Sequence, residues 1–284
     1  MSNDPSDRVS LESSFVRVDD QPDPSLLVDT MDQTSQWPAI IALRAFEADH
    51  LDLGPGDRAL DVGCGRGEVA CAMAARVGPD GRVVGVDASE AMLANAREQA
   101  SATGVDVEFI VGDCLALAEA DGSFDAVRAE RVLQWIDDSE AAVAELVRVL
   151  RPGGRLGLID TDWRTLAIDL PDHDAADAVG RAMVATRGLP ARIGGRLVNL
   201  CRHAGLVDID VRPATHVWTE WDPDTQIAPS GFFPLDEVTP QFVDSGALSA
   251  EQCETFLTQA RAAGREGRLF MSLTMFAVAA RKPG

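Results

Sequence analysis

The segment 59–70, ALDVGCGRGEVA, holds residues whose types and spacing could bind a charged small molecule. Gly63, Gly65 and Gly67 stand at every second position, and Asp61 precedes the first of them by two residues. A glycine-rich turn between a strand and a helix lets the backbone approach a ligand closely. By themselves, the glycines leave a dinucleotide, a phosphate or another ligand as candidates.

Two common phosphate-binding patterns fit this turn poorly. A dinucleotide fingerprint needs a third glycine three residues after the second, and Glu68 occupies that position, which counts against a nicotinamide oxidoreductase. A P-loop needs a lysine after its last glycine, and none follows Gly67. The carboxylate of Asp61 would repel a pyrophosphate but would suit a cation. A sulfonium that carries an α-amino group is such a cation.

The elements around the turn alternate regularly. Apolar runs separated by turn residues predict strands and helices in succession from residue 58 to residue 162. Strands of this kind, nearly continuous in apolar residues, indicate a parallel sheet covered on both faces. The expected strands are 58–63, 82–88, 107–113, 124–130 and 154–162, and the expected helices are 67–77, 89–103 and 137–150.

The alternation breaks after residue 162, and the chain before the turn is helical. We expect one or two helices within 29–51 and a flexible tail over 1–25, which is rich in Ser, Asp and Pro. After the break we expect helices at 173–186, 195–204 and 249–267, strands at 207–213 and 269–283, and irregular structure over 214–247.

Four further motifs follow the glycine turn in order. VVGVDAS contains Asp87, twenty residues after Gly67, VGDC contains Asp113, and FDAVRAERVLQWIDD and RVLRPGGRLGLID come next. Together with LDVGCGRGE, these motifs resemble class I S-adenosylmethionine-dependent methyltransferases, in the branch that acts on small molecules in bacterial specialised metabolism. The resemblance covers about residues 57–160.

The resemblance implies a fold and a domain organisation. The implied fold is α/β, with a Rossmann-like, mostly parallel sheet of seven strands, helices on both faces and an antiparallel last strand. A lid would come from the N-terminal helices and from insertions. We therefore expect one methyltransferase domain over 26–284, divided into lid helices (26–52), a cofactor-binding core (53–162) and substrate-cap insertions (163–195 and 214–267).

The resemblance also implies S-adenosylmethionine as the cofactor. Asp87 would accept hydrogen bonds from the ribose hydroxyls, and Asp113 would bind the adenine amino group. Asp61 could instead stabilise the turn alone, Asp87 could be a helix N-cap, and Asp113 could be an ordinary loop acid. The expected cofactor-binding residues are Asp61, Gly63, Cys64, Gly65, Gly67, Asp87, Ala88, Met92, Gly112, Asp113, Cys114, Glu130 and Arg131.

The acceptor is expected at the carboxyl ends of the fourth and fifth strands, under the lid. Tryptophans concentrate in these segments, and an aromatic pocket would suit a flat acceptor, although the same rings could simply pack the lid onto the sheet. The expected acceptor residues are Met31, Trp37, Gln134, Trp135, Asp160, Trp163, Trp218, Phe232 and Phe233. The candidate general bases are Asp160, Asp162, His173 and His216.

The composition of the chain limits the classes of partner and the kinds of site that we expect. The formal charge is −21 and no cluster of lysines and arginines is visible, which argues against nucleic acid and anionic membranes as partners. The five cysteines form no C-x-x-C pair, so neither a zinc site nor a disulfide framework is expected. The polar, acidic start of the sequence lacks a secretory pattern, so we expect a cytoplasmic protein. We expect it to be a monomer or a homodimer.

The expected reaction is methyl transfer to a carbon, nitrogen or oxygen atom of a small, aromatic or heteroaromatic acceptor, an indole-like carbon included. Positioning and desolvation would supply much of the rate. Two alternatives stay open at this point. One is a protein of the same fold that catalyses a non-methylating reaction, such as a cyclisation, and the other is a regulator that binds S-adenosylmethionine.

Overall fold

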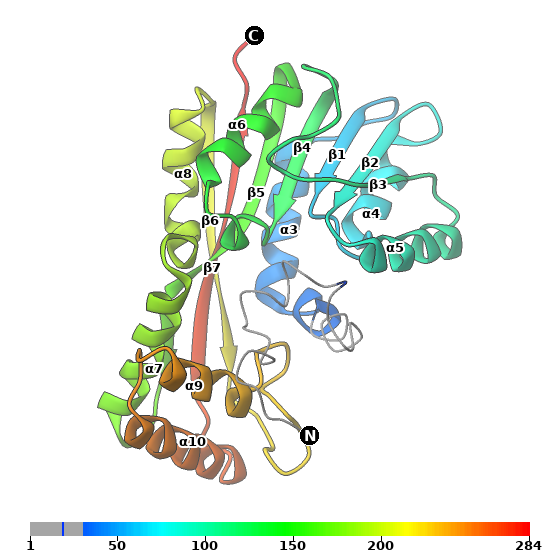
Figure 1. Ribbon diagram of the computed structural model, residues 1–284. Helices are drawn as coiled ribbons and strands as arrows, with labels where there is room; N and C mark the ends of the chain where they lie inside the picture. Colours follow the sequence, from blue (N-terminus) through cyan, green and yellow to red (C-terminus); the bar gives the residue numbers. More distant parts are fainter. Residues whose placement is uncertain (1–18, 20–30) are drawn as a thin grey trace.

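The computed structural model describes residue 19 and residues 31–284. Its centre is a seven-stranded sheet in the order β3-β2-β1-β4-β5-β7-β6, in which β7 runs antiparallel to both neighbours (Figure 1). This is the fold expected from the sequence. The strands are β1 (Arg58–Val62), β2 (Arg82–Asp87), β3 (Glu108–Val111), β4 (Phe124–Glu130), β5 (Leu150–Ile168), β6 (Val207–Trp218) and β7 (Met271–Arg281).

Helices cover both faces of the sheet. A short helix over residues 31–35 comes first. The longer helices are α3 (Pro38–Leu51), α4 (Glu68–Val77), α5 (Glu90–Thr103), α6 (Ser139–Val149), α7 (His173–Arg187), α8 (Ile193–His203), α9 (Leu235–Asp244) and α10 (Ala250–Arg265). Two short 3-10 helices also occur in this part of the chain: η3 (Leu133–Trp135) lies between β4 and α6, and η4 (Leu189–Arg192) lies between α7 and α8.

Alternate residues of the strands face opposite helical layers, as the pleat requires. Leu60 of β1 belongs to the buried cluster that contains the apolar faces of α6 and α8. Its neighbour Ala59 belongs to the cluster formed with α4. On that second face, α3 packs Ile40 and Leu43 in a cluster with Ile159 of β5. The glycine turn therefore leaves the sheet between two buried layers that fix its position.

Three expectations for the second half of the chain were wrong. The strand expected to end at residue 162 continues to Ile168, the one expected to end at 213 continues to Trp218, and α9 lies where irregular structure was expected. Both strand ends are paired with Met271 at the start of β7, so the long central partner decides their length. The helix α9 was missed because it contains Pro240, which reads as a helix breaker.

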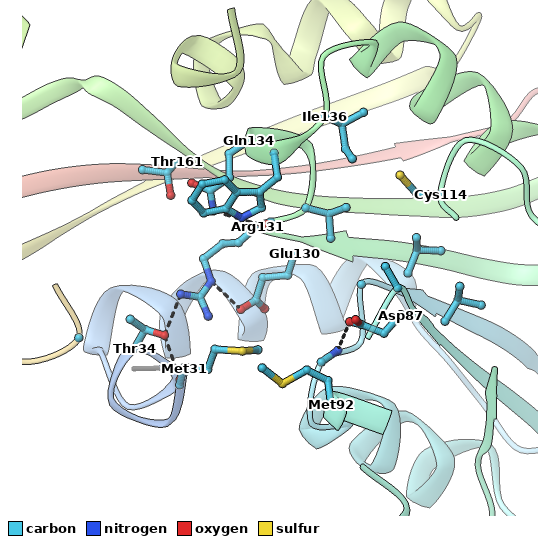
Figure 2. Close-up of a pocket in the computed structure, with 18 of the residues that line it drawn as sticks. Met31, Thr34, Asp87, Met92, Cys114, Glu130, Arg131, Gln134, Ile136 and Thr161 are labelled. Carbon is cyan, nitrogen blue, oxygen red and sulfur yellow. Dashed lines mark hydrogen bonds and ion pairs between the residues drawn. The ribbon is translucent and has the colours of Figure 1, made fainter. Parts of the chain in front are cut away.

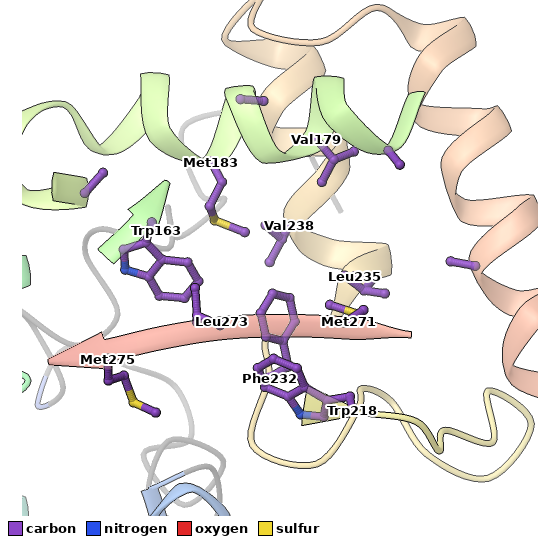
Figure 3. Close-up of a cluster of buried hydrophobic side chains, with 14 of the residues drawn as sticks. Trp163, Val179, Met183, Trp218, Phe232, Leu235, Val238, Met271, Leu273 and Met275 are labelled. Atoms are coloured by element: carbon purple, nitrogen blue, oxygen red, sulfur yellow. The ribbon is translucent and has the colours of Figure 1, made fainter. Parts of the chain in front are cut away.

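The extended ends of β5, β6 and β7 build a second core away from the glycine turn. Helices α7, α9 and α10 pack around these strand ends (Figure 1). Figure 3 shows large side chains from β5, β6, β7, α7, α9 and the loop before α9 meeting there, among them Trp163, Met183, Trp218, Phe232 and Met271. This core holds the segments that were expected to cover the acceptor.

Within residues 31–284, no helix is both long enough and apolar enough to cross a bilayer. The expected N-terminal tail, 1–25, lies outside the described residues except for Asp19.

Candidate active site

Backbone hydrogen bonds attach the glycine turn, which follows β1, to the end of β2. The backbone N–H groups of Gly63 and Cys64 both donate to the carbonyl of Val86, at 2.7 and 3.0 Å. Gly63 and Gly65 have φ values of +68° and +52°, in the left-handed region that glycine adopts without strain. A Cβ on Gly65 would lie 2.6 Å from the methyl carbon at the end of the Met31 side chain, so a larger residue would have to displace Met31 and also adopt a left-handed φ.

Asp87 holds this turn in place from the end of β2. Its Oδ2 accepts from the Gly65 N–H at 2.8 Å, and its Oδ1 accepts from the Ser89 N–H at 3.0 Å (Figure 2). Ser89, and not Asp87, caps α5 by accepting from the Met92 N–H at 3.1 Å. Burial raises the pKa of Asp87. Each carboxylate oxygen retains a lone pair, so Asp87 can still accept hydrogen bonds from a bound ligand.

One large cavity opens beside the turn, at the carboxyl ends of β1, β2 and β4. Its empty volume is about 1330 Å³, including the open mouth. Ten of the residues expected to bind the cofactor line this cavity: Gly63, Gly65, Asp87, Ala88, Met92, Gly112, Asp113, Cys114, Glu130 and Arg131.

Asp61, Cys64 and Gly67 lie outside the wall of this cavity. Asp61 and Cys64 line a second, more polar cavity on the other side of the turn. Asp61 is buried, and its Oδ1 accepts from Nη1 of Arg128 at 2.8 Å. Its carboxylate thus serves an internal ion pair, a role that the sequence reading did not consider. Burial raises the pKa of the Cys64 thiol, which fits a packing residue. A Cβ on Gly67 would meet Phe109 and Ala96 within 3 Å, so this glycine serves close packing.

The ion pair of Asp61 belongs to a buried cluster around Arg128. This guanidinium donates to Glu47 at 2.6 Å, to Asp61 at 2.8 Å and to Glu130 at 2.8 Å. Arg44 donates twice to Glu130, at 2.7 and 2.9 Å. Burial raises the pKa of Glu47 to about 7. In Glu130, burial acts in the same direction, but the charges of Arg44 and Arg128 outweigh it and hold the pKa well below its usual range.

Arg131 lies between the two halves of the large cavity. It follows β4 with a φ of +56°, and its backbone N–H donates to the carbonyl of Ile159 at 2.7 Å. Its Nη1 donates to Oγ1 of Thr34 at 2.7 Å, and its Nε lies 3.6 Å from Oε1 of Glu130 (Figure 2). Burial lowers the pKa of Arg131. The left-handed backbone turns this guanidinium toward the short helix at 31–35.

The half of the cavity beyond Arg131 is walled by aromatic rings. We call it the acceptor chamber and define it by Trp37, Trp135, Trp163, Phe232 and Phe233, all of which line the cavity. The ring centroids of Trp163 and Phe233 are 5.7 Å apart.

Polar contacts hold two of these rings. Nε1 of Trp163 donates to Oε1 of Gln134 at 3.0 Å. Trp218 lies one layer behind, edge-on to Trp37 and Phe232 with ring centroids 5.1 and 5.2 Å away. Trp37 and Trp218 both donate from Nε1 to the Ser230 carbonyl, at 3.1 and 2.9 Å. Met31 and Gln134, also expected for the acceptor, line the cavity as well, whereas Trp218 does not.

The four candidate bases do not line the cavity. Asp160 is buried, and its two oxygens accept from the backbone N–H groups of Thr161 and Gln134, at 2.8 and 3.1 Å. Burial raises the pKa of Asp160 to about 7. Asp162 is paired with Arg164, whose Nε donates to Oδ1 at 2.8 Å.

The two histidines also lie away from the cavity wall. His173 is exposed at the first position of α7. His216 stacks on the outer side of the chamber against Trp37, with ring centroids 4.1 Å apart, and burial lowers its pKa to about 4. Neither imidazole is placed to take a proton from a molecule in the cavity.

Some residues of the site gave no sequence signal. Four residues that line the cavity belong to none of the motifs: Thr34, Thr161, Gly231 and Leu273. Four others lie within the motifs but were not expected at the site: Val62, Val86, Val132 and Ile136. Arg187, at the end of α7, was also missed, although its guanidinium lies 4.4 Å from the ring centroid of Trp163. Among the described residues, no group of three or more His, Cys, Asp or Glu side chains could hold a metal ion.

Comparisons with known proteins agree with this geometry. A family profile described as a methyltransferase domain matches residues 59–154. An uncharacterized 37.1 kDa protein in transposon TN4556 of Streptomyces fradiae is 35% identical over 254 residues, which cover 89% of this chain and 70% of that protein. The demethylmenaquinone methyltransferase of Bacillus cytotoxicus is 38% identical over 117 residues, 41% of this chain but only 49% of the relative.

A solved structure shows the same fold. Phosphoethanolamine N-methyltransferase 2 of Haemonchus contortus, in complex with S-adenosyl-L-methionine, matches with a TM-score of 0.58 and 19% identity over 97% of this chain and 60% of that one. The chain belongs to the class I S-adenosylmethionine-dependent methyltransferases. Its cofactor is S-adenosylmethionine, and the left-handed glycines at 63 and 65 and the carboxylate of Asp87, which retains a lone pair on each oxygen, fit that molecule.

Proposed function

We propose that this protein transfers a methyl group from S-adenosylmethionine to a small acceptor with an aromatic or heteroaromatic ring. The observation that carries the proposal is the single cavity that joins the glycine turn and Asp87 to the acceptor chamber. Cofactor and acceptor would meet beside Arg131, within one continuous cavity.

Different residues of the cofactor half would bind different parts of S-adenosylmethionine. Asp87 would accept the ribose hydroxyls, since its oxygens retain lone pairs beside Gly65 and Ser89. Asp113, whose Oδ1 already accepts from the Leu115 N–H at 2.8 Å, would offer its other oxygen to the adenine amino group. Gly63 and Gly65 would leave room for the backbone to touch the ligand.

When bound, S-adenosylmethionine supplies an electrophilic methyl group on a sulfonium. The chain's own part is to align the acceptor and to exclude water. Trp163, fixed by its hydrogen bond to Gln134, would present a rigid face to a flat acceptor. No imidazole lines the acceptor chamber within the described part of the chain, so the proposal includes no histidine base.

Two other findings support a small acceptor of this type. The name of the demethylmenaquinone methyltransferase refers to an acceptor that contains a ring, and we propose a ring-containing acceptor for this chain too. The formal charge of −21 makes a polyanionic partner such as nucleic acid unfavourable. The five free, buried cysteines fit a reducing compartment such as the cytoplasm, where we propose that the protein acts.

Calorimetry with S-adenosylmethionine tests the cofactor half. We expect saturable binding by the parent chain and at least tenfold weaker binding by Asp87→Ala, because hydrogen bonds to a charged group are worth about 1.5–3 kcal/mol each. Asp106→Ala removes an exposed acid elsewhere and should bind like the parent. Failure of the parent chain to bind would refute the proposal.

Product analysis then tests the acceptor half. The chain is incubated with S-adenosylmethionine and menadiol, 1-naphthol or indole, and S-adenosylhomocysteine and methylated product are measured by mass spectrometry. Equal amounts of both products are expected from at least one ring acceptor. Tight cofactor binding without S-adenosylhomocysteine from any acceptor would contradict methyl transfer and would favour a non-methylating reaction.

A further inference from the structure

A polar side chain interrupts the apolar row that β5 presents to the acceptor chamber. Successive side chains of a strand point to opposite faces, so Ile159, Thr161 and Trp163 share one face of β5. Ile159 and Trp163 belong to the buried apolar core on that face, and Thr161 between them is only 3% exposed. Its sheet partner on β7 is the buried Met275. Thr161 therefore occupies a position with apolar neighbours on its own strand and on the next.

The hydroxyl of Thr161 is available to a ligand. The side chain lines the large cavity (Figure 2). Its backbone N–H donates to Oδ1 of Asp160 at 2.8 Å, but its hydroxyl has no hydrogen-bond partner in the part of the chain that the structure describes. When an acceptor displaces water from the chamber, a hydroxyl without a partner weakens binding. An acceptor that forms a hydrogen bond to this hydroxyl is therefore favoured over one that does not.

The other threonine of the cavity wall is already engaged. Oγ1 of Thr34 donates to the Met31 carbonyl at 2.9 Å and accepts from Nη1 of Arg131 at 2.7 Å. Thr34 therefore has a structural use for its hydroxyl, whereas Thr161 does not.

Gln134 supplies a second polar group beside the chamber. It is buried and lines the cavity. Its Oε1 accepts from Nε1 of Trp163 at 3.0 Å, and its Nε2 donates to the Arg131 carbonyl at 3.2 Å, so both ends of the amide are oriented by neighbours. A primary amide has two N–H donors, so one donor of Gln134 remains for a ligand.

The buried carboxylate of Asp160 fixes these two residues relative to each other. Its Oδ2 accepts from the Gln134 N–H at 3.1 Å, and its Oδ1 accepts from the Thr161 N–H at 2.8 Å. One carboxylate thus joins the start of η3 to β5. In a mostly apolar pocket, a few polar groups held in this way orient the ligand and provide specificity.

We propose that the acceptor ring carries an oxygen substituent, a hydroxyl or a carbonyl, which accepts hydrogen bonds from the Thr161 hydroxyl and the Gln134 amide. The inference rests on the proposed methyl transfer and names the substrate class of the same site. Thr161 and Gln134 determine the specificity for this substituent, and Asp160 is a positioning residue that acts through both.

The two donors exclude part of the range of ring acceptors. A hydroxyl or carbonyl oxygen has two lone pairs and can accept from both residues at once. An indole N–H could donate to the Thr161 oxygen, but it would leave the Gln134 donor without an acceptor. A ring without any polar substituent would leave both groups unpaired.

Matched ligands test the inference without catalysis. Equilibrium dialysis measures the binding of 1-naphthol and of 1-fluoronaphthalene to the chain in the presence of S-adenosylhomocysteine. Fluorine is close in size to a hydroxyl but accepts hydrogen bonds poorly, and hydrophobic burial alone would favour the fluorinated ring. We expect the parent chain to bind 1-naphthol at least about tenfold more tightly, because a site that forms hydrogen bonds with a hydroxyl rejects the analogue that lacks it.

Variants assign that preference to the two residues. Thr161→Val should reduce the preference for 1-naphthol severalfold, whereas Thr161→Ser keeps the hydroxyl and should retain it. Thr215→Val replaces an exposed threonine of β6 and should behave like the parent. Gln134→Met should also reduce the preference, whereas Trp163→Phe removes the same hydrogen bond to the indole but leaves the Gln134 donor, and should retain it.

Circular dichroism and S-adenosylmethionine binding show whether each variant is folded. The inference is overturned if the parent chain binds neither ligand or binds 1-fluoronaphthalene as tightly as 1-naphthol. It is also overturned if Thr161→Val leaves the preference unchanged, as expected for a hydroxyl that holds only water, or if Thr161→Ser loses it as fully as Thr161→Val. Methylation of indole would still leave the proposed function standing, whereas failure to bind S-adenosylmethionine would refute both.

Discussion

Replacing Arg128 with methionine should destabilise the protein severely. The guanidinium is 3% exposed and donates to Glu47, Asp61 and Glu130 at 2.6–2.8 Å. Glu130 would keep Arg44, but Glu47 and Asp61 would be left as buried acids without this cation. Breaking a buried ion pair on one side costs about 3–5 kcal/mol, which corresponds to a fall in melting temperature of roughly 5–8 °C for a chain of this length.

The cost should depend on pH in a defined direction. In the parent chain, burial raises the pKa of Glu47 from its ordinary value of 4.5 to about 7. Loss of Arg128 removes the charge that opposes this rise, so the pKa of Glu47 should rise further. A carboxyl whose pKa is higher in the folded state stabilises most below its unfolded pKa, and that contribution is lost as the pH rises through the folded pKa. Arg128→Met should therefore lose stability more steeply than the parent between pH 5 and pH 8.

Urea unfolding at pH 5.5 and pH 8 measures both effects as free energies of unfolding. Arg155→Met is the matched control, because Arg155 lies on the neighbouring strand, is 40% exposed and pairs with Asp52 at the surface. Such surface pairs contribute about 0–1 kcal/mol. The reasoning is refuted if Arg128→Met costs no more than the control, or if its cost is the same at both pH values.

Three further changes test other parts of the site. Gly65→Ala places a Cβ 2.6 Å from the Met31 methyl carbon at a φ of +52°, so affinity for S-adenosylmethionine should fall about tenfold in calorimetry, and unchanged affinity would contradict the role of the turn. Trp163→Phe removes the hydrogen bond to Gln134 and should raise the KM for the acceptor severalfold while the Kd for S-adenosylmethionine stays constant. A change in the Kd for S-adenosylmethionine alone would contradict the assignment of this ring to the acceptor chamber. Burial raises the pKa of Asp160 from 3.8 to about 7, so the parent should lose up to about 4 kcal/mol of stability from this group as the pH rises from 4 to 7. Asp160→Asn should flatten that slope in urea unfolding, and an equally steep slope would count against a protonated Asp160.

The glycine turn and the strands beside it could be predicted because their signals are local. The spacing of Gly63, Gly65 and Gly67, the distance to Asp87 and the alternation of strands and helices all follow from backbone geometry and apolar periodicity. Family, fold and cofactor follow from these signals. The sequence also placed most of the tryptophans at the cavity, since the carboxyl ends of neighbouring strands meet at one edge of a sheet.

Contacts between distant residues gave no such signal. Asp61 was expected to face a cationic ligand, but its Oδ1 bonds to Arg128, 67 positions away in the sequence. The sequence could not rank the candidate bases either, because the backbone groups that engage Asp160 and the ring that stacks on His216 are set by packing.

By itself, the sequence determined the class of protein and most residues of the cavity wall beside the glycine turn, because a turn and its neighbouring strand ends are specified within a few residues. Only the tertiary structure decided the character of the acceptor half. The rings of Trp135, Trp163 and Phe233 come from separate parts of the chain and meet over Arg187. Their common wall exists only because β5 and β6 extend along β7 and carry α7 against them. Hydrophobic burial and strand pairing across the whole chain bring these groups together, and no local pattern records the result.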